Sequence, residues 1–455
     1  MITLSFFGGA KEVTGACYLL DTGATKLLID CGLFQCPRFC ERKNEEPFPF
    51  ATDTLDALII THAHIDHIGR VPKLARQYFR GKIYSTKPTK DFAAIMLADS
   101  LGVLEKEARD ENRGAFYSEE DIAKALSVWE GVEYYHAFQV GDATITLRNA
   151  GHILGSALVE IEVPSHEGNI KIVFTGDLGN APNPLIMPPD ALADARHLII
   201  ESAYGNRAHE GSGERTQKFE RVIEDTLTKG GVLMIPAFSL ERTQELLFEL
   251  NDFFENNRVP RVPVFIDSPL AIKATAIYRN YQRYFSKDAR RILEVDDNLF
   301  NFPGLTLAQK TEESKAINEV PAPKIIIAGA GMMQGGRILH HAKRYVPDPK
   351  STLLFIGYQA KGSMGRQLIE GAKEVHIMGE RVAINATIKA IGGYSAHADA
   401  DALYAFVEHS KSTLKNVFVV QGEEEAADAL AQRIRDNFAI NTYVPAFGEK
   451  AVLEA

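Results

Sequence analysis

Short apolar runs separated by turn residues recur along the first part of the chain, a pattern typical of buried β-strands. The runs are rich in Ile, Val, Leu and Phe and are bounded by Gly, Asp or Asn. The pattern predicts strands at 2–7, 17–20, 26–30, 57–61, 82–85, 143–149, 157–163 and 170–174, and helices at 89–112 and 118–129. Strands that alternate with helices indicate a layered α/β fold.

The alternation begins again after a strand that ends at Glu201. Strands are expected at 232–235, 264–266, 324–327 and 352–356, with helices at 240–254, 269–284 and 336–345. This rhythm predicts a second α/β domain with a parallel sheet, over 205–385. The remaining tail, 386–455, is short for a domain of its own, so we expect it to complete the first domain, 1–204.

The composition is that of a globular protein, with 45% apolar and 24% charged residues in a chain of 455. The net charge of -10 gives no general attraction to a polyanion, so a nucleic-acid substrate requires basic residues gathered locally. The sequence contains neither an apolar run long enough to span a membrane nor a secretory leader, and we expect a cytoplasmic protein with no membrane partner.

Three imidazoles and a carboxylate lie within six residues, at His62, His64, Asp66 and His67. They follow the apolar run 58–60 and precede a helix expected at 69–79, which places them at the carboxyl end of a strand. Imidazole and carboxylate suit zinc or another divalent first-row metal. Ligands crowded this tightly can hardly all reach one ion, so the spacing indicates two ions close together.

Two further candidate ligands lie where an apolar strand runs into glycine. His152 stands in NAGHILGS, 149–156, and Asp177 in FTGDLG, 174–179. Each glycine removes a Cβ and lets the backbone approach a metal. Beside the histidine cluster, we interpret both residues as ligands and not as structural polar residues.

These motifs make the chain similar to the β-CASP nucleases of the metallo-β-lactamase fold, which include ribonuclease J, the pre-mRNA 3′-end-cleaving subunit and compact bacterial relatives. The matching motifs are LIDCG (28–32), THAHIDH (61–67), GH (151–152), GD (176–177), Glu201 before YGNR (204–207), IPAF (235–238), RTQE (242–245), DSPL (267–270), GGR (335–337), GGYSAHAD (392–399) and VVQGE (419–423). The resemblance implies an αββα metallo-β-lactamase sandwich, an inserted β-CASP domain and an active-site cleft between them.

The resemblance also implies roles for single residues. It assigns His62, His64 and His152 to one zinc ion, Asp66 and His67 to a second, and Asp177 to both. Asp30 would orient a ligand through a hydrogen bond. A hydroxide held by the zinc pair would attack a phosphodiester of single-stranded RNA, with Asp66 in the catalytic centre and with Glu201 and His397 handling the proton of the leaving group. The implied protein is a ribonuclease, endo- or exonucleolytic, and a homodimer is compatible with the resemblance.

One position departs from the family pattern, which usually reads V-H-G-E where this chain has Gln421. A glutamine oxygen is a neutral zinc ligand, weaker than imidazole. We therefore expect the second site to be weak, to select a harder ion such as manganese, or to be empty in the isolated protein, with some activity retained.

A glycine-rich turn, 329–337, precedes a helix and can direct backbone N–H groups at phosphate, but a plain tight turn explains the same glycines about as well. The resemblance favours phosphate binding and implies candidate residues for RNA binding. The candidates are Arg207, Ser239, Arg242, Ser268, Gly335, Arg337, Lys361 and Arg366. Substitution of Arg337 by alanine is expected to weaken RNA binding and to flatten its salt dependence.

Two alternatives stay open at this point. The chain could be a metallohydrolase of the same fold that acts on a thioester, a lactone or a small phosphodiester, although an inserted domain disfavours small substrates. It could also be an RNA-binding or scaffold subunit without activity, which Gln421 favours and the otherwise intact ligand set disfavours.

Overall fold

The computed structural model describes residues 1–35, 41–166, 168–294, 298–357, 359 and 362–454. It contains two compact units, the first formed by Met1–Ala181, Met187–Ala208 and His397–Ala455, the second by Pro182–Ile186 and His209–Ala396. The candidate Lys361 lies outside the described residues. Within the described part of the chain, no helix has the length and apolar character needed to cross a membrane.

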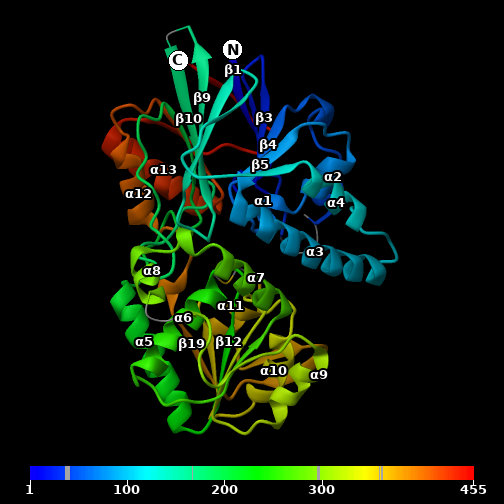
Figure 1. Ribbon diagram of the computed structural model, residues 1–455, viewed down its shortest axis with the longest axis vertical. Coiled ribbons are helices and arrows are strands. Elements are labelled where there is room, and N and C mark those ends of the chain that lie inside the picture. Colours follow the sequence, from blue (N-terminus) through cyan, green and yellow to red (C-terminus); the bar gives the residue numbers. More distant parts are fainter. Residues whose placement is uncertain (36–40, 167, 295–297, 358, 360–361, 455) are drawn as a thin grey trace. The chain divides into compact units, whose positions relative to one another are not determined.

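The first unit is built on two seven-stranded sheets (Figure 1). In spatial order, one sheet contains β22 (Lys450–Leu453), β1 (Ile2–Phe6), β2 (Tyr18–Asp21), β3 (Lys26–Ile29), β4 (Ala57–Ile59), β5 (Lys82–Thr86) and β6 (Trp129–Val132). From β3 to β6 all neighbours are parallel, whereas the pairs from β22 to β3 are antiparallel. The parallel part places the carboxyl ends of β3 and β4 at the same edge.

The other sheet contains β21 (Asn441–Tyr443), β20 (Asn416–Val420), β11 (His197–Glu201), β10 (Gly168–Phe174), β9 (Ala157–Ser165), β8 (Ala143–Asn149) and β7 (Phe138–Val140). Here β10, β11, β20 and β21 are parallel. The tail of the chain thus supplies strands to both sheets, since β20 pairs with β11 and β22 pairs with β1.

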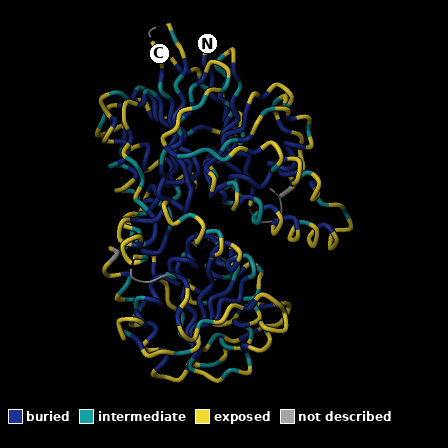
Figure 2. Tube along the Cα trace, viewed as in Figure 1, coloured by how far each residue is buried: buried dark blue, intermediate teal, exposed yellow. Residues whose placement is uncertain are grey.

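The two sheets pack face to face through buried aromatic and aliphatic side chains. Tyr18 of β2 stacks on Phe174 of β10 at a centroid distance of 6.1 Å, and Phe6 of β1 contacts Phe418 of β20 at 5.5 Å. Figure 2 shows the central strands of both sheets, such as β1, β4, β11 and β20, as buried. Burial of such side chains contributes about 1.5–3 kcal/mol each, which explains why these strands are nearly continuous apolar runs.

Helices cover the outer faces of this sandwich. Between strands β4 and β6 of the first sheet the chain forms α1 (Ile65–Ile68), α2 (Val71–Arg76), α3 (Lys87–Asp110) and α4 (Glu119–Ser127), and α3 packs on β5 and β6. The second sheet packs on α12 (Ala400–His409) and α13 (Glu424–Phe438). The helix expected at 69–79 is instead two short helices, because α1 begins inside the histidine motif and Pro72 lies in the first turn of α2. The layers are therefore helix, sheet, sheet, helix, as the resemblance implies.

The second unit has a six-stranded sheet in which every neighbouring pair is parallel. Its order is β14 (Leu305–Leu307), β13 (Val264–Asp267), β15 (Lys324–Ala328), β12 (Val232–Pro236), β16 (Thr352–Phe355) and β19 (Thr387–Ala390). Its helices are α5 (Ser212–Thr228), α6 (Arg242–Glu255), α7 (Pro269–Asn280), α8 (Lys287–Leu293), α9 (Thr311–Ala316), α10 (Ile338–Tyr345) and α11 (Met364–Ile369), and it also has a hairpin of β17 (Glu374–Ile377) and β18 (Glu380–Ala383). The predicted parallel α/β sheet is confirmed.

The stretch 386–396 lies with the second unit and not with the tail. The reason is that β19 forms the edge of the six-stranded sheet, where it pairs with β16 from Thr352–Thr387 to Phe355–Ala390. Backbone pairing of this kind is not visible in the sequence, which placed the boundary at 385.

Candidate metal centre

The candidate ligands follow strand ends at one edge of the sandwich in the first unit. Asp177 comes three residues after β10, Glu201 ends β11, and Gln421 directly follows β20. Because these three strands are parallel neighbours, their carboxyl ends meet at the same edge. The histidine motif follows β4 in the facing sheet, and His152 follows β8.

Three imidazoles and one carboxylate converge on a common point. His64 Nδ1 lies 3.1 Å from His62 Nε2 and 3.2 Å from His152 Nε2. Asp177 Oδ2 lies 3.5 Å from the Nε2 atoms of both His62 and His152. Zinc binds imidazole nitrogen at about 2.0–2.1 Å, so four tetrahedral ligands lie about 3.3–3.4 Å from one another. We call these four residues the three-histidine set, and their spacing fits a zinc ion.

The protonation state of the set also fits a metal. His62 and His152 are fully buried, and burial, followed by the neighbouring His67, holds the pKa of His62 well below its usual range. A neutral imidazole is the form that binds a cation. Ser156 accepts a hydrogen bond from the backbone N–H of His152 at 3.0 Å through its hydroxyl and fixes this loop.

Asp30 fixes the histidine motif through hydrogen bonds to Thr61 and His67. Its Oδ1 accepts the backbone N–H of Thr61 at 2.8 Å, and its Oδ2 accepts the Thr61 hydroxyl at 2.7 Å and lies 2.7 Å from His67 Nδ1. This arrangement orients Nε2 of His67 toward Asp177 Oδ1, at 3.3 Å. The sequence missed the role of Thr61, although it is the first residue of the motif.

Burial lowers the pKa of His67, but the negative charges of Asp177 and Asp30 outweigh burial and raise the pKa well above its usual range. A cation ligated by Asp177 offsets the first of these charges and favours the imidazole that carries one proton, on Nδ1 toward Asp30.

The residues expected at a second ion are arranged differently. Asp66 Oδ2 lies 3.9 Å from His67 Nε2, and Asp66 and His67 both lie on α1. The side chain of Gln421 is buried, and its Nε2 lies 2.8 Å from His67 Nε2 and 2.9 Å from Asp177 Oδ1. The second group therefore contains a hydrogen-bond donor between two candidate ligand atoms, and its residues do not fit an ion as the three-histidine set does.

The half-buried His397 and the fully buried Glu201 form a pair beside Asp177. His397 Nδ1 lies 3.1 and 3.2 Å from the two carboxylate oxygens of Glu201 and 3.8 Å from Asp177 Oδ2. Glu201 also accepts the backbone N–H of Leu178 at 2.7 Å. Burial lowers the pKa of His397, but Glu201 and then Asp177 outweigh it and raise that pKa to about 9, so the imidazole carries two protons at neutral pH.

Three family models match the chain. They are the metallo-beta-lactamase superfamily over residues 10–208, the Beta-Casp domain over 243–368 and the Zn-dependent metallo-hydrolase RNA specificity domain over 381–445. The chain is 38% identical over 426 residues to a ribonuclease of Thermus thermophilus, with 94% of each chain covered. The chain belongs to the β-CASP family of metallo-β-lactamase-fold hydrolases. The predicted fold class and enzyme class are thereby confirmed.

Two further relatives of this β-CASP protein come from an archaeon. It is 33% identical over 457 residues to the transcription termination factor FttA of Methanocaldococcus jannaschii, covering 98% of this chain and 70% of that one. It is 32% identical over 453 residues to an RNase J-like protein of the same organism, covering 98% and 99%. A solved structure of a protein of unknown function from Enterococcus faecalis shares the fold, with a TM-score of 0.55, 12% identity and coverage of 99% and 100%.

The basic candidates of the β-CASP protein for RNA binding differ in how their guanidinium groups are engaged. Arg242 is buried and paired with Glu245. Arg337 donates to Asp267 Oδ1 at 2.7 Å and to the carbonyl oxygens of 308 and 309 at 2.9 and 2.8 Å. The sequence missed the acceptors of Arg337 because they lie 28 to 70 positions away along the chain, whereas Glu245 lies three positions after Arg242.

Arg207 is exposed, and its guanidinium lies 5.5 Å from the ring of Tyr204. The carbonyl oxygen of Arg207 accepts the backbone N–H of Ala400, three residues after His397. The remaining candidates lie in the second unit, where the hydroxyls of Ser239 and Ser268 are 3.4 Å apart; Gly335 precedes α10, and Arg366 pairs with Glu370. Arg207 is thus the candidate whose backbone meets the segment that follows His397.

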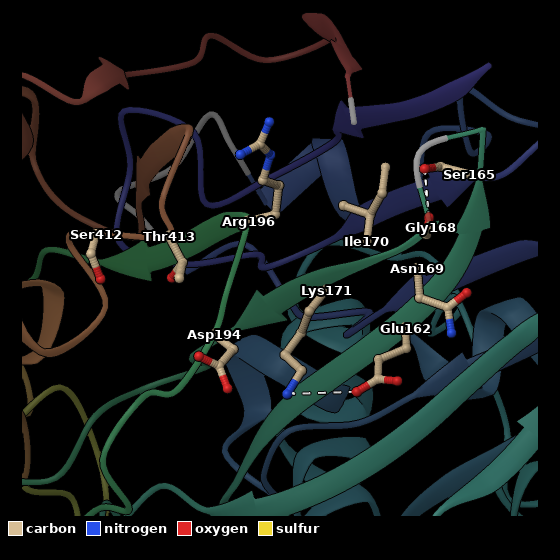
Figure 3. A pocket seen from close by; sticks show the side chains of 10 residues that line it. All are labelled: Glu162, Ser165, Gly168, Asn169, Ile170, Lys171, Asp194, Arg196, Ser412 and Thr413. Atoms are coloured by element: carbon tan, nitrogen blue, oxygen red, sulfur yellow. Dashed lines mark hydrogen bonds and ion pairs between the residues drawn. The ribbon is translucent and has the colours of Figure 1, made fainter.

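A surface hollow of about 620 Å³ lies in the first unit, and Figure 3 shows its lining side chains. They are Glu162, Ser165, Gly168, Asn169, Ile170, Lys171, Asp194, Arg196, Ser412 and Thr413. Arg196 directly precedes β11, and Gly168 begins β10, so the hollow lies at the starts of strands whose ends carry Asp177 and Glu201. The hollow and the candidate metal centre are therefore at opposite ends of these strands.

Proposed function

We propose that this chain is a zinc-dependent ribonuclease that hydrolyses phosphodiester bonds of single-stranded RNA. The observation that supports the proposal is the three-histidine set with the His397–Glu201 pair beside it, an arrangement suited to a cation next to a proton donor. The RNA specificity domain in the match and the relatives named as ribonuclease and RNase J-like support RNA as the substrate.

In this proposal His62, His64, His152 and Asp177 hold zinc. When bound, zinc polarises a phosphoryl oxygen and lowers the pKa of water, which supplies the nucleophile. Asp30 fixes the orientation of His67 and, through Thr61, the start of the histidine motif. Loss of such a supporting residue typically costs about 10–100-fold in metal affinity or activity.

His397 donates the proton to the ribose oxygen that leaves. Its pKa of about 9 keeps the proton in place at neutral pH, and the developing negative charge on the oxygen draws it away in the transition state. Glu201 is buried and shielded from solvent, so its charge acts on His397 through a low-dielectric environment. We therefore assign His397 as the general acid and Glu201 as the residue that holds it charged and oriented.

Single strands are the proposed form of RNA because the candidate ligands are recessed. His62 and His152 are fully buried, so a scissile phosphate has to leave the surface of a regular duplex to reach them. The exposed Arg207, whose backbone meets the segment that follows His397, is the proposed contact to a neighbouring phosphate.

The test is cleavage of end-labelled single-stranded RNA with zinc, and separately with manganese, by wild type and by His397→Ala. The matched control is His409→Ala, which removes an exposed histidine at the end of α12. We expect metal-dependent products from wild type and control and none from His397→Ala, and the product ladder separates internal cuts from end-wise degradation. Binding of RNA without cleavage under either metal would instead support a scaffold role.

A further inference from the structure

The two groups of candidate ligands on either side of Asp177 are opposite in hydrogen-bonding character. Oδ2 of Asp177 faces His62 and His152 at 3.5 Å, where ring nitrogens and a carboxylate oxygen converge on one point. Oδ1 of the same carboxylate faces the amide nitrogen of Gln421 at 2.9 Å. The first arrangement favours a cation, and the second already contains a group that carries partial positive charge.

The orientation of the Gln421 amide follows from its partners. If the amide were reversed, its oxygen would lie 2.9 Å from Asp177 Oδ1, and two acceptors would face each other. With nitrogen in this place, one hydrogen is directed at Asp177 Oδ1 and the other at His67 Nε2, 2.8 Å away. His67 accepts it in the form with a single proton on Nδ1, directed at Asp30 2.7 Å away, and a cation bound to Asp177 favours this form.

The backbone holds Gln421 in this position. Its N–H donates to the carbonyl oxygen of Gly9 at 2.7 Å, its φ is +49°, and only 3% of its surface is exposed. A Cβ on Gly9 would lie 3.0 Å from Gln421 Cγ, so the absence of a side chain at Gly9 leaves room for the side chain of Gln421. The carboxamide is therefore packed between the two candidate ligand atoms and not free to turn into solvent.

We propose that the carboxamide of Gln421 takes the place of the second metal ion, joining His67 to Asp177 through its two hydrogens, so that the chain holds one zinc ion at the three-histidine set. An amide NH2 group has no lone pair for a cation, and an ion bound to both His67 Nε2 and Asp177 Oδ1 would need the position that the amide hydrogens occupy. The proposal rests on the proposed function only for the identity of the metal.

The grouping of candidate ligands among the described residues agrees with a single zinc ion at the three-histidine set. The groups of three or more His, Cys, Asp or Glu side chains that could together hold an ion are the three-histidine set and a second group of Asp177, Glu201 and His397. Asp66 and His67 belong to neither group within the described chain. An ion count of two would therefore have to come from a rotated Gln421 or from the His397 group.

The test is the zinc content per chain after removal of metal, reconstitution with zinc and desalting, measured by elemental mass spectrometry. We expect one zinc for wild type and two for Gln421→His, which provides an imidazole in place of the donor. The control Gln432→His adds a histidine on the exposed face of α13 and should stay at one. Reconstitution with Mn²⁺ gives an independent signal, because spin coupling between two ions in the electron paramagnetic resonance spectrum should be present only in Gln421→His.

Gln421→Glu serves if the histidine variant fails to fold, because it keeps the shape and replaces the donor with a carboxylate. We expect it to bind two ions and to lose thermal stability in chelator, with recovery on addition of zinc. Two ions in wild type, or one ion in both variants when folded, would overturn the proposal. If wild type binds two ions and His397→Ala binds one, the second ion lies at the His397 group, which also overturns it.

RNA cleavage by the same samples separates this proposal from the function. If wild type binds one zinc and cleaves RNA, the amide proposal and the ribonuclease proposal are both supported. If wild type binds one zinc and does not cleave RNA, the amide proposal holds and the ribonuclease proposal fails. Two ions with cleavage refute the amide proposal alone.

Discussion

Replacement of Glu201 by glutamine tests how the chain keeps a proton on His397. The imidazole Nδ1 lies 3.1 and 3.2 Å from the carboxylate oxygens, and Glu201 itself is fully buried. Glutamine keeps the shape of the side chain and one acceptor but removes the negative charge. The variant therefore changes the pKa of His397 more than it changes the packing around it.

The size of the effect follows from the two pKa values of His397. Burial lowers the pKa, yet Glu201 and Asp177 raise it from 6.5 to about 9, which corresponds to ~3.4 kcal/mol in favour of the charged imidazole. Glu201 raises the pKa more than Asp177 does, so its neutralisation should lower the pKa by at least about one unit, or ~1.4 kcal/mol. A group with a raised pKa is protonated below that pKa, so the acid is lost as pH rises through it.

The assay is single-turnover cleavage of labelled RNA between about pH 6 and 10 with the metal content checked at each pH. We expect the wild-type rate to fall on the alkaline side near pH 9, and the Glu201→Gln rate to fall at least about one pH unit lower. The control Glu423→Gln neutralises an exposed carboxylate at the start of α13 and should keep the wild-type profile. An alkaline limb at the same pH in Glu201→Gln would refute the assignment of His397 as an acid charged by Glu201.

Two further predictions concern stability, measured by urea denaturation. A Cβ on Gly32 would collide with the carbonyl oxygen of Asp66, so Gly32→Ala should cost ~1–3 kcal/mol and weaken zinc binding, whereas Gly102→Ala on α3, with open space around it, should stabilise by ~0.5–1 kcal/mol. Equal effects of the two substitutions would contradict the predicted backbone contact. Burial raises the pKa of Glu241 to about 7, so the folded chain binds more protons than the unfolded chain from about pH 4.5 to 7 and loses stability as pH rises through this window. Glu241→Gln should therefore gain up to ~3.4 kcal/mol relative to wild type between pH 4.5 and 8, and a pH-independent difference would rule this out.

The apolar pattern predicts the central elements of the fold well and its edges poorly. The strand at 143–149 has the predicted bounds, because it combines a clear period with strong end signals. The edge strands β7, β14 and β22 were not predicted, since they are short and largely half-buried or exposed. Such strands are held by backbone pairing to a neighbour, which leaves little trace in the local sequence.

The positions of the candidate ligands follow from a simple rule that the sequence does reveal. His62, His152 and Asp177 each come shortly after an apolar run, and strands of one sandwich end at shared edges, so residues separated by more than a hundred positions meet. The partner of Arg337 could not be found in this way, because Asp267 lies 70 positions away along the chain and meets Arg337 only through tertiary packing. Glu245 lies three positions after Arg242 on the same helix, and here the sequence did not reveal that both side chains are buried.

Gln421 shows most clearly what the sequence alone leaves undecided. From the sequence alone, glutamine can be compared with the usual histidine only by its strength as a zinc ligand, and an amide oxygen is weaker than imidazole. The structure adds the direction of the amide, because Asp177 Oδ1 and His67 Nε2 both face its nitrogen. Oδ2 of Asp177 faces the histidines of the three-histidine set and lies 3.8 Å from His397 Nδ1, whereas Oδ1 accepts from the Gln421 amide. A change at Gln421 should therefore affect the ion count and, through the charge on Asp177, the acid that serves the leaving group.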